Sequence, residues 1–187
     1  MAQNQRVYLV FGEDDYMVGN YSRQLVDRLV PVAQRSFGLD IIDGRAMTVE
    51  EAVNIHGRCI ESLLTMAFMG GSKVVWLRNA NFLNDGNVVG KSATVKDKLS
   101  ELVAVIEKGG AGDNILVVSA TKVDRRYAFY KACEKIAEVK EFDVPQQAYR
   151  AEMQAASTLT EELRKQGLSM DGEAREMFLE RIGAGTR

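Results

Sequence analysis

The residues best placed to carry chemistry lie in the loop after the first predicted strand, residues 11–20. Ligands of parallel α/β sheets usually bind where the strands end, so a nucleotide would be expected at this loop. A phosphate-binding loop needs a glycine-rich backbone, a lysine, and a Ser or Thr for Mg²⁺. This loop has no lysine, and its glycines and acidic residues are Gly12, Glu13, Asp14, Asp15 and Gly19. Three adjacent carboxylates would repel a triphosphate, so we expect a degenerate loop that binds no nucleotide.

A second glycine-rich stretch, Gly86-Asn-Val-Val-Gly90-Lys91-Ser92, ends like a phosphate-binding loop. Three residues separate its glycines where the motif needs four, and a long polar segment separates it from the preceding strand. No Asp-Glu pair follows the apolar run 115–119, as it would in a strand that helps to hold Mg²⁺. We interpret residues 84–94 as a surface loop. The alternative is a phosphate site.

The single histidine, His56, shares a helical spacing with Val53 and Ile60. This pattern predicts a half-buried histidine with satisfied hydrogen bonds rather than a catalytic base. The two cysteines, Cys59 and Cys133, lie in helix-like segments and form no CxxC pair. With so few candidate ligands and nucleophiles, we expect no metal site, no cofactor and no nucleophilic catalysis.

The charges are nearly balanced, with 24 Lys and Arg against 26 Asp and Glu, a net charge of −2. This balance argues against a nucleic-acid binder held by a basic face, but it allows contact with DNA inside a larger assembly. We expect pairs such as Asp14-Asp15 at helix N-termini or on solvated faces. A solvated face is also expected for the basic cluster, with a phosphate or partner contact as the alternative: Lys122, Arg125, Arg126 and Lys131.

The elements that must position these residues alternate along the chain. Strands are predicted at residues 6–11, 39–43, 73–78, 114–119 and 138–143. Amphipathic helices are predicted at residues 16–29, 48–67, 95–106 and 127–137, the second beginning with a capping box from Thr48 to Glu51. This alternation predicts an α/β fold with a parallel five-stranded sheet and helices on both faces.

The alternation stops near Pro145, and two helical segments follow at residues 146–165 and 171–181. We therefore predict an α/β domain at residues 1–143 and an incomplete helical domain at residues 144–187. The first apolar run is too short for a signal peptide, and no run is long enough to span a membrane. We expect a cytoplasmic protein with no membrane partner.

Phe68 and Met69 stand at the end of the second predicted helix, just before Gly70 and Gly71. Glycines suit a helix C-terminus, so the pair would project from it. An exposed Phe-Met pair suits a hydrophobic pocket on a partner, because Met adapts its shape and Phe supplies contact area. In the alternative, both side chains fold back onto the sheet.

The order of these segments resembles the delta subunit of bacterial DNA polymerase III, the clamp-loader subunit that opens the sliding clamp. Tyr8-Leu-Val-Phe-Gly-Glu-Asp-Asp-Tyr16 and the Asp43-Gly44 pair are similar to the family's opening. The stretches that begin Phe68-Met-Gly-Gly-Ser-Lys and Leu116-Val-Val-Ser-Ala-Thr-Lys also fit its pattern. The later Gly167-Leu-Ser and Phe178-Leu-Glu-Arg resemble its lid helices.

The resemblance implies an AAA+-like fold without a working nucleotide site, followed by the start of a helical lid. It implies partners too: the sliding clamp (beta subunit), the gamma or tau and delta prime subunits, and primed DNA within the assembled loader. The resemblance also implies that the chain is non-catalytic on its own and would be a subunit of a DNA-directed DNA polymerase holoenzyme. Clamp contact would fall on Phe68 and Met69, with Ala67 as an alternative member and Leu64 and Lys73 at the rim.

Two other interpretations stay open. The chain could be a P-loop-type NTPase or nucleotide kinase that uses residues 86–92 or the 12–20 loop. It could also be a regulatory α/β module that binds some other protein.

Overall fold

Five short strands form one parallel sheet in the computed structural model, which describes residues 6–66, 72–110, 113–143, 146–172, 174–175 and 177–178. The sheet order is β2-β3-β4-β1-β5, so β2 and β5 are the edge strands. The strands are β1 (Val7–Phe11), β2 (Leu39–Asp43), β3 (Val74–Arg78), β4 (Ile115–Ala120) and β5 (Glu138–Glu141). β-branched and leucine-rich runs suit the three central strands, because both of their faces are buried.

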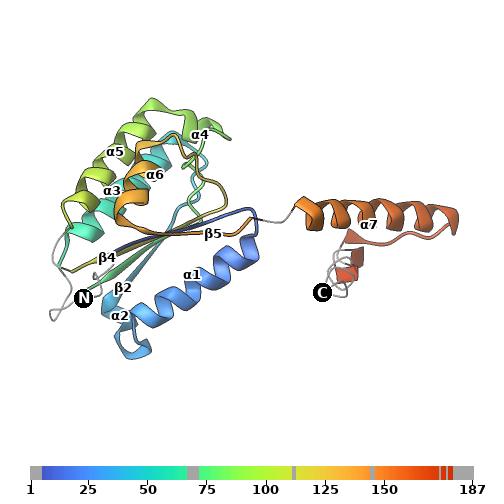
Figure 1. Ribbon diagram of the computed structural model, residues 1–187, viewed down its shortest axis with the longest axis horizontal. Coiled ribbons are helices and arrows are strands. Elements are labelled where there is room, and N and C mark those ends of the chain that lie inside the picture. The colour runs from blue at the N-terminus through green and yellow to red at the C-terminus, as the bar shows by residue number, and fades with distance from the viewer. Residues whose placement is uncertain are drawn as a thin grey trace. The chain divides into compact units, whose positions relative to one another are not determined.

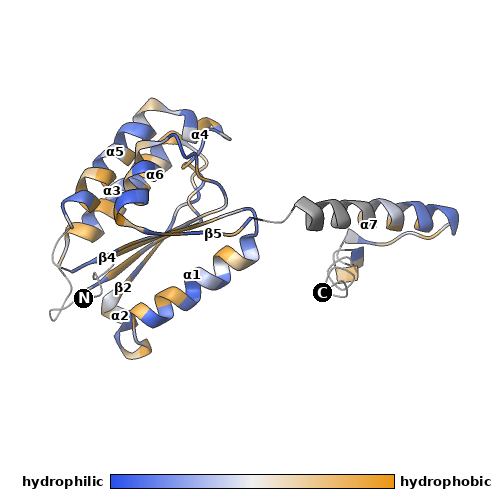
Figure 2. Ribbon diagram, viewed as in Figure 1, coloured by the Kyte–Doolittle hydropathy of each residue, from blue (hydrophilic) through white to orange (hydrophobic). Residues whose placement is uncertain are grey.

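Helices cover both faces of the sheet, as predicted (Figure 1). On one face α3 (Val49–Leu64), α5 (Ala93–Glu107) and α6 (Ala128–Ile136) pack over Leu116 and Val118. On the other face α1 (Asp15–Leu29) packs against Trp76 and Val117. Hydrophobic and hydrophilic residues alternate around these helices, which leaves an apolar stripe for the sheet (Figure 2).

The helix boundaries follow local capping chemistry. The predicted capping box is confirmed, because Glu51 N–H donates to Thr48 Oγ1 and the Glu51 carboxylate accepts from Thr48 N–H. The same helix, α3, ends at Leu64, before the predicted end at residue 67. The prediction overlooked a short turn before β2, formed by η1 (Val32–Gln34) and α2 (Arg35–Gly38).

The prediction of a plain surface loop over residues 84–94 is wrong. This segment contains α4 (Val88–Lys91), capped by the Asn87 side chain, and α5 begins at Ala93. Val89 and Gly90 are buried, and a Cβ on Gly90 would lie 1.9 Å from the Asn84 carbonyl oxygen. The segment is therefore packed against its neighbours, and only a glycine fits at its centre.

The chain divides into two compact units, Met1–Asp143 and Val144–Arg187. The second unit contains α7 (Gln146–Lys165), which has the predicted bounds, and a following turn in which Asp171 accepts from Ala174 N–H. Arg175 donates to Thr160 Oγ1 and so ties this turn to α7. None of the helices in the described part of the chain has the length and apolar composition of a membrane span.

Candidate functional site

The loop after β1 is held by backbone bonds to the ends of its two neighbouring strands, β4 and β5. Gly12 N–H donates to the Ala120 carbonyl at 3.3 Å, and Asp14 N–H donates to the Phe142 carbonyl at 3.1 Å. Phe142 N–H in turn donates to the Phe11 carbonyl at 2.8 Å. The N–H groups of Gly12 and Asp14, which a phosphate could otherwise use, are therefore already bonded to the chain itself.

The carboxylates of this loop have structural partners as well. Asp14 is the N-cap of α1 and accepts from Met17 N–H at 2.9 Å, while Asp15 accepts from Thr121 Oγ1 at 3.0 Å. Both residues thus stand at a helix N-terminus, as predicted, where a negative charge is favourable. Gly19 lies further along α1, so it is not part of the loop with Gly12 and the three carboxylates.

Gly12 lies against the backbone of Phe142, the residue that follows β5. Its φ is +147°, and a Cβ there would lie 2.0 Å from the Phe142 carbonyl oxygen. The glycine serves a close approach of two backbones, not an approach to a ligand.

The second glycine-rich stretch offers no phosphate cradle either. Gly86 N–H donates to Asn84 Oδ1, and Gly90 N–H donates to Asn87 Oδ1. The N–H groups of Lys91 and Ser92 are bonded within α4. Local asparagine side chains and helical turns therefore occupy the donors that a phosphate would require.

The opposite edge of the sheet, where the strands begin, holds the end of α3, which precedes the predicted partner-binding segment in the sequence. α3 ends there with two exposed apolar residues, Leu64 at 52% and Met66 at 75% exposure. The next predicted contacts, Ala67, Phe68 and Met69, lie outside the described residues.

Lys73, which we expected at the rim of that segment, is buried. It is 6% exposed, and its Nζ forms an ion pair with Asp40 at 3.0 Å. Asp40 also accepts from Ser62 Oγ at 2.5 Å. Partial burial acts to raise the pKa of Asp40, but the bonds from Ser62 and Lys73 outweigh it and hold that pKa below its ordinary value. The placement corrects the prediction, because a lysine held this way is a support and not a surface contact.

Asn114 is a residue of this edge that sequence reasoning missed. It is buried just before β4, and its Oδ1 accepts from Lys73 N–H at 3.0 Å. Its Nδ2 donates to the carbonyls of Leu63 at 3.0 Å and Thr65 at 2.9 Å. The only local signal is a polar residue at the start of a buried strand.

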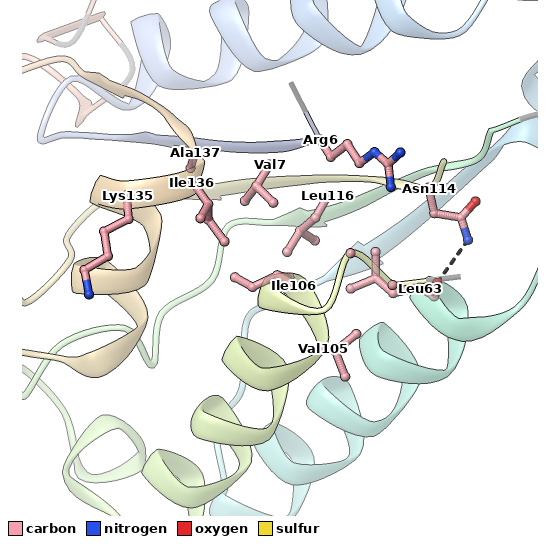
Figure 3. Close-up of a pocket in the computed structure, with 12 residues that line it drawn as sticks. Arg6, Val7, Leu63, Val105, Ile106, Asn114, Leu116, Lys135, Ile136 and Ala137 are labelled. Carbon is pink, nitrogen blue, oxygen red and sulfur yellow. Dashed lines mark hydrogen bonds between the residues drawn. The ribbon is translucent and has the colours of Figure 1, made fainter. Parts of the chain in front are cut away.

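A cavity of about 510 Å³ opens beside Asn114 (Figure 3). Its walls come from β1, β4, α6 and the ends of α3 and α5. Apolar side chains such as Leu63 and Ile136 line it together with the polar side chains of Arg6, Asn114 and Lys135. The edge with the exposed end of α3 therefore also has a hollow of mixed polarity.

The predicted basic cluster lies on the surface, and its arginines are paired. Arg125 forms an ion pair with Glu141 at 2.6 Å, and Arg126 forms one with Asp124 at 2.6 Å. The bond from Arg126 lowers the pKa of Asp124 to about 2. This pairing offsets the positive charge of the two arginines, which weakens their attraction for phosphate.

His56 is more deeply buried than the half-buried position predicted for it. It is completely buried against Phe82, with ring centroids 4.5 Å apart, and Nδ1 donates to the Ala52 carbonyl at 2.7 Å. Its Nε2 is buried and has no hydrogen-bond partner within the described part of the chain. Desolvation by burial lowers the pKa of His56, so the ring is held neutral.

Metal-ligating side chains do not converge. Across the described ranges, no group of three or more His, Cys, Asp or Glu is arranged to hold an ion.

The model of the DNA polymerase III delta subunit family matches residues 8–143, well over half of the chain. The chain belongs to this family. A search of curated proteins gives no match.

Two solved structures are similar to this chain. The Bacillus subtilis DNA clamp loader delta protein is similar with a TM-score of 0.55 and 21% identity, over 82% of this chain and 43% of that one. A DNA polymerase III gamma subunit-related protein from Thermotoga maritima is similar with a TM-score of 0.49 and 14% identity, over 87% of this chain and 49% of that one. This delta-family chain thus spans less than half the length of either protein.

Proposed function

We propose that this chain binds a sliding clamp and favours the clamp's open form, acting as the clamp-opening subunit of a replicative clamp loader. The observation that carries the proposal is the end of α3, where exposed Leu64 and Met66 lead into the segment with Phe68 and Met69. Large apolar side chains grouped at one edge suit a pocket on a protein partner. Membership of the delta family supports the choice of the clamp as that partner.

Opening would be driven by binding alone. A contact shifts the clamp toward its open form only to the extent that it binds the open form more tightly. The chain would act in the cytoplasm with the gamma or tau and delta prime subunits, and it would meet primed DNA within that assembly.

ATP would be bound and hydrolysed by other subunits. This part of the proposal is supported by the loop after β1, whose backbone donors bond to Ala120 and Phe142 and whose side chains are acidic. Both features oppose the binding of a triphosphate.

The test is a titration of the whole chain against the sliding clamp of its own organism. The variant Phe68→Ser/Met69→Ser should weaken binding by at least about 2 kcal/mol, roughly 30-fold in Kd, because truncated hot spots lose this much. A matched control is Met47→Ser/Val88→Ser, which removes two residues that are just as apolar and are 85% and 80% exposed away from the end of α3. The control should bind like the wild type.

If the wild type and the Phe68→Ser/Met69→Ser variant bind the clamp equally well, the clamp is still the partner, but Phe68 and Met69 are not its binding site. If the wild type does not bind the clamp, the proposed function is wrong. A parallel titration with Mg²⁺-ATP should give no binding, and micromolar affinity would favour the NTPase interpretation.

A further inference from the structure

Two stems support the segment at residues 66–72, and both contact one buried side chain. The first stem is the end of α3, with the carbonyls of Leu63 and Thr65, and the second is Lys73 at the start of β3. Asn114 bonds to all three residues (its bond to Leu63 is drawn in Figure 3). Lys73 is held on its other side too, because its carbonyl accepts from Ile115 N–H at 2.8 Å.

The chemistry of these bonds requires an amide side chain. Asn114 uses both of its donors on the first stem and its oxygen acceptor on the second. A carboxylate of the same shape would keep the bond to Lys73 but would set an oxygen against the carbonyls of Leu63 and Thr65.

A second polar bridge joins the same stems from the far side. Asp40 on β2 accepts from Ser62 Oγ of α3 and pairs with Lys73 Nζ. Two independent side chains therefore fix how far apart the segment begins and ends. Asn114 and Lys73 are buried polar groups whose bonds are satisfied, and such groups make a rigid base.

We infer that Asn114 is a positioning residue for clamp binding: it holds both stems of the segment at residues 66–72 and so raises the affinity that this segment gives. Asn114 is 4% exposed, so a partner cannot touch it and its effect must pass through the stems. Binding by a segment with fixed ends costs less conformational entropy than binding by one with free ends. The inference rests on the proposed function.

The variant that tests it is Asn114→Asp, and its matched control is Ser119→Ala. Ser119 is buried as well and bonds to Trp76 Nε1 and Asn79 N–H, but it lies at the other end of β4. Both variants remove hydrogen bonds made by buried side chains on or next to β4, while only Asn114→Asp releases a stem.

The whole chain and these two variants are titrated against the clamp, with and without Phe68→Ser/Met69→Ser. Asn114→Asp should raise Kd by roughly tenfold, and Ser119→Ala should leave Kd unchanged. In the Phe68→Ser/Met69→Ser background, Asn114→Asp should have no further effect, because the segment through which it acts no longer contributes.

Hydrogen exchange of the amides at residues 60–75 gives a readout that needs no clamp. Asn114→Asp should speed their exchange by at least roughly tenfold while the amides of β1 keep their rate. Should Asn114→Asp fail to fold, Asn114→Ser, which keeps one short polar group, takes its place in every measurement.

Unchanged exchange in Asn114→Asp overturns the inference, as does an equal loss of clamp affinity in Ser119→Ala. Faster exchange with unchanged Kd also overturns it, since the stems would then not matter for binding. If the wild type does not bind the clamp, the proposed function fails instead, and the exchange result alone shows whether Asn114 holds the stems.

Discussion

His56 shows how a single residue couples this fold to pH. It is the only histidine in the chain, and histidine is the side chain that normally titrates between pH 5 and 8. Its ring is completely buried, and among the described residues Nε2 has no hydrogen-bond partner. The folded protein therefore resists protonating it, whereas the unfolded chain does not.

We predict that His56 does not reduce the free energy of unfolding above about pH 6.5. As the pH is lowered through that value, the free energy of unfolding should fall. The direction follows from the pKa of His56, which burial holds below its unfolded value, so the unfolded state takes up the proton first. Urea denaturation at pH 7.5, 6.5 and 5.5 measures the slope. His56→Leu should flatten it, and a wild type whose stability rises on acidification would contradict the prediction.

Asn114 illustrates why part of the candidate site could not be predicted from the sequence. Its partners lie 41 to 51 residues away, so no spacing or periodicity connects them. Phe68 and Met69 could be singled out because both features that mark them, apolar bulk and the glycines that follow, are local.

At the scale of elements, strands and long helices were predictable because their patterns are strong. Every predicted strand is present, and the run at residues 39–43 has the bounds of β2. α4 was missed because it has four residues, one of them Gly90, and too few turns to show a helical period. The end of α3 was placed too late because apolar residues continue past Leu64 in the sequence.

The turn between β1 and α1 gives an element-scale prediction. Gly12→Ala should lower the free energy of unfolding by more than about 2 kcal/mol, because the new Cβ would collide with the Phe142 carbonyl at a strained φ. Gly19→Ala is the matched control. Nothing lies within 4 Å of a Cβ there, so this change within α1 should stabilise the protein by about 0.5–1 kcal/mol.

Chemical denaturation of the wild type and the two alanine variants measures these changes in the free energy of unfolding. Equal stabilities would mean that the backbone around Gly12 can move away from β5. In that case the packing of this turn would not explain why Gly12 is needed.

At the scale of the whole molecule, the two apolar clusters belong to the first unit. Among the residues that the structure describes, their buried members run from Val7 to Cys133, and the partly buried residues packed against them extend to Phe142. The proposed clamp site and its stems also lie within this unit.

We therefore predict that a chain of residues 1–143 folds alone. It should unfold at the same denaturant concentration as the first unit of the 187-residue chain, and it should bind the clamp with the same Kd. Circular dichroism and the clamp titration test the two statements. A fragment that is unfolded, or folded but tenfold weaker, would show that residues 144–187 support the site.

The open edges of the sheet have a consequence for how this protein behaves when it is concentrated. Each edge strand displays acidic side chains: Asp40 and Asp43 on β2, and Glu138 and Glu141 on β5. A strand from another molecule that docked on either edge would have to bury these carboxylates and separate them from their present partners. The charge on both edge strands thus opposes edge-to-edge aggregation of the sheet.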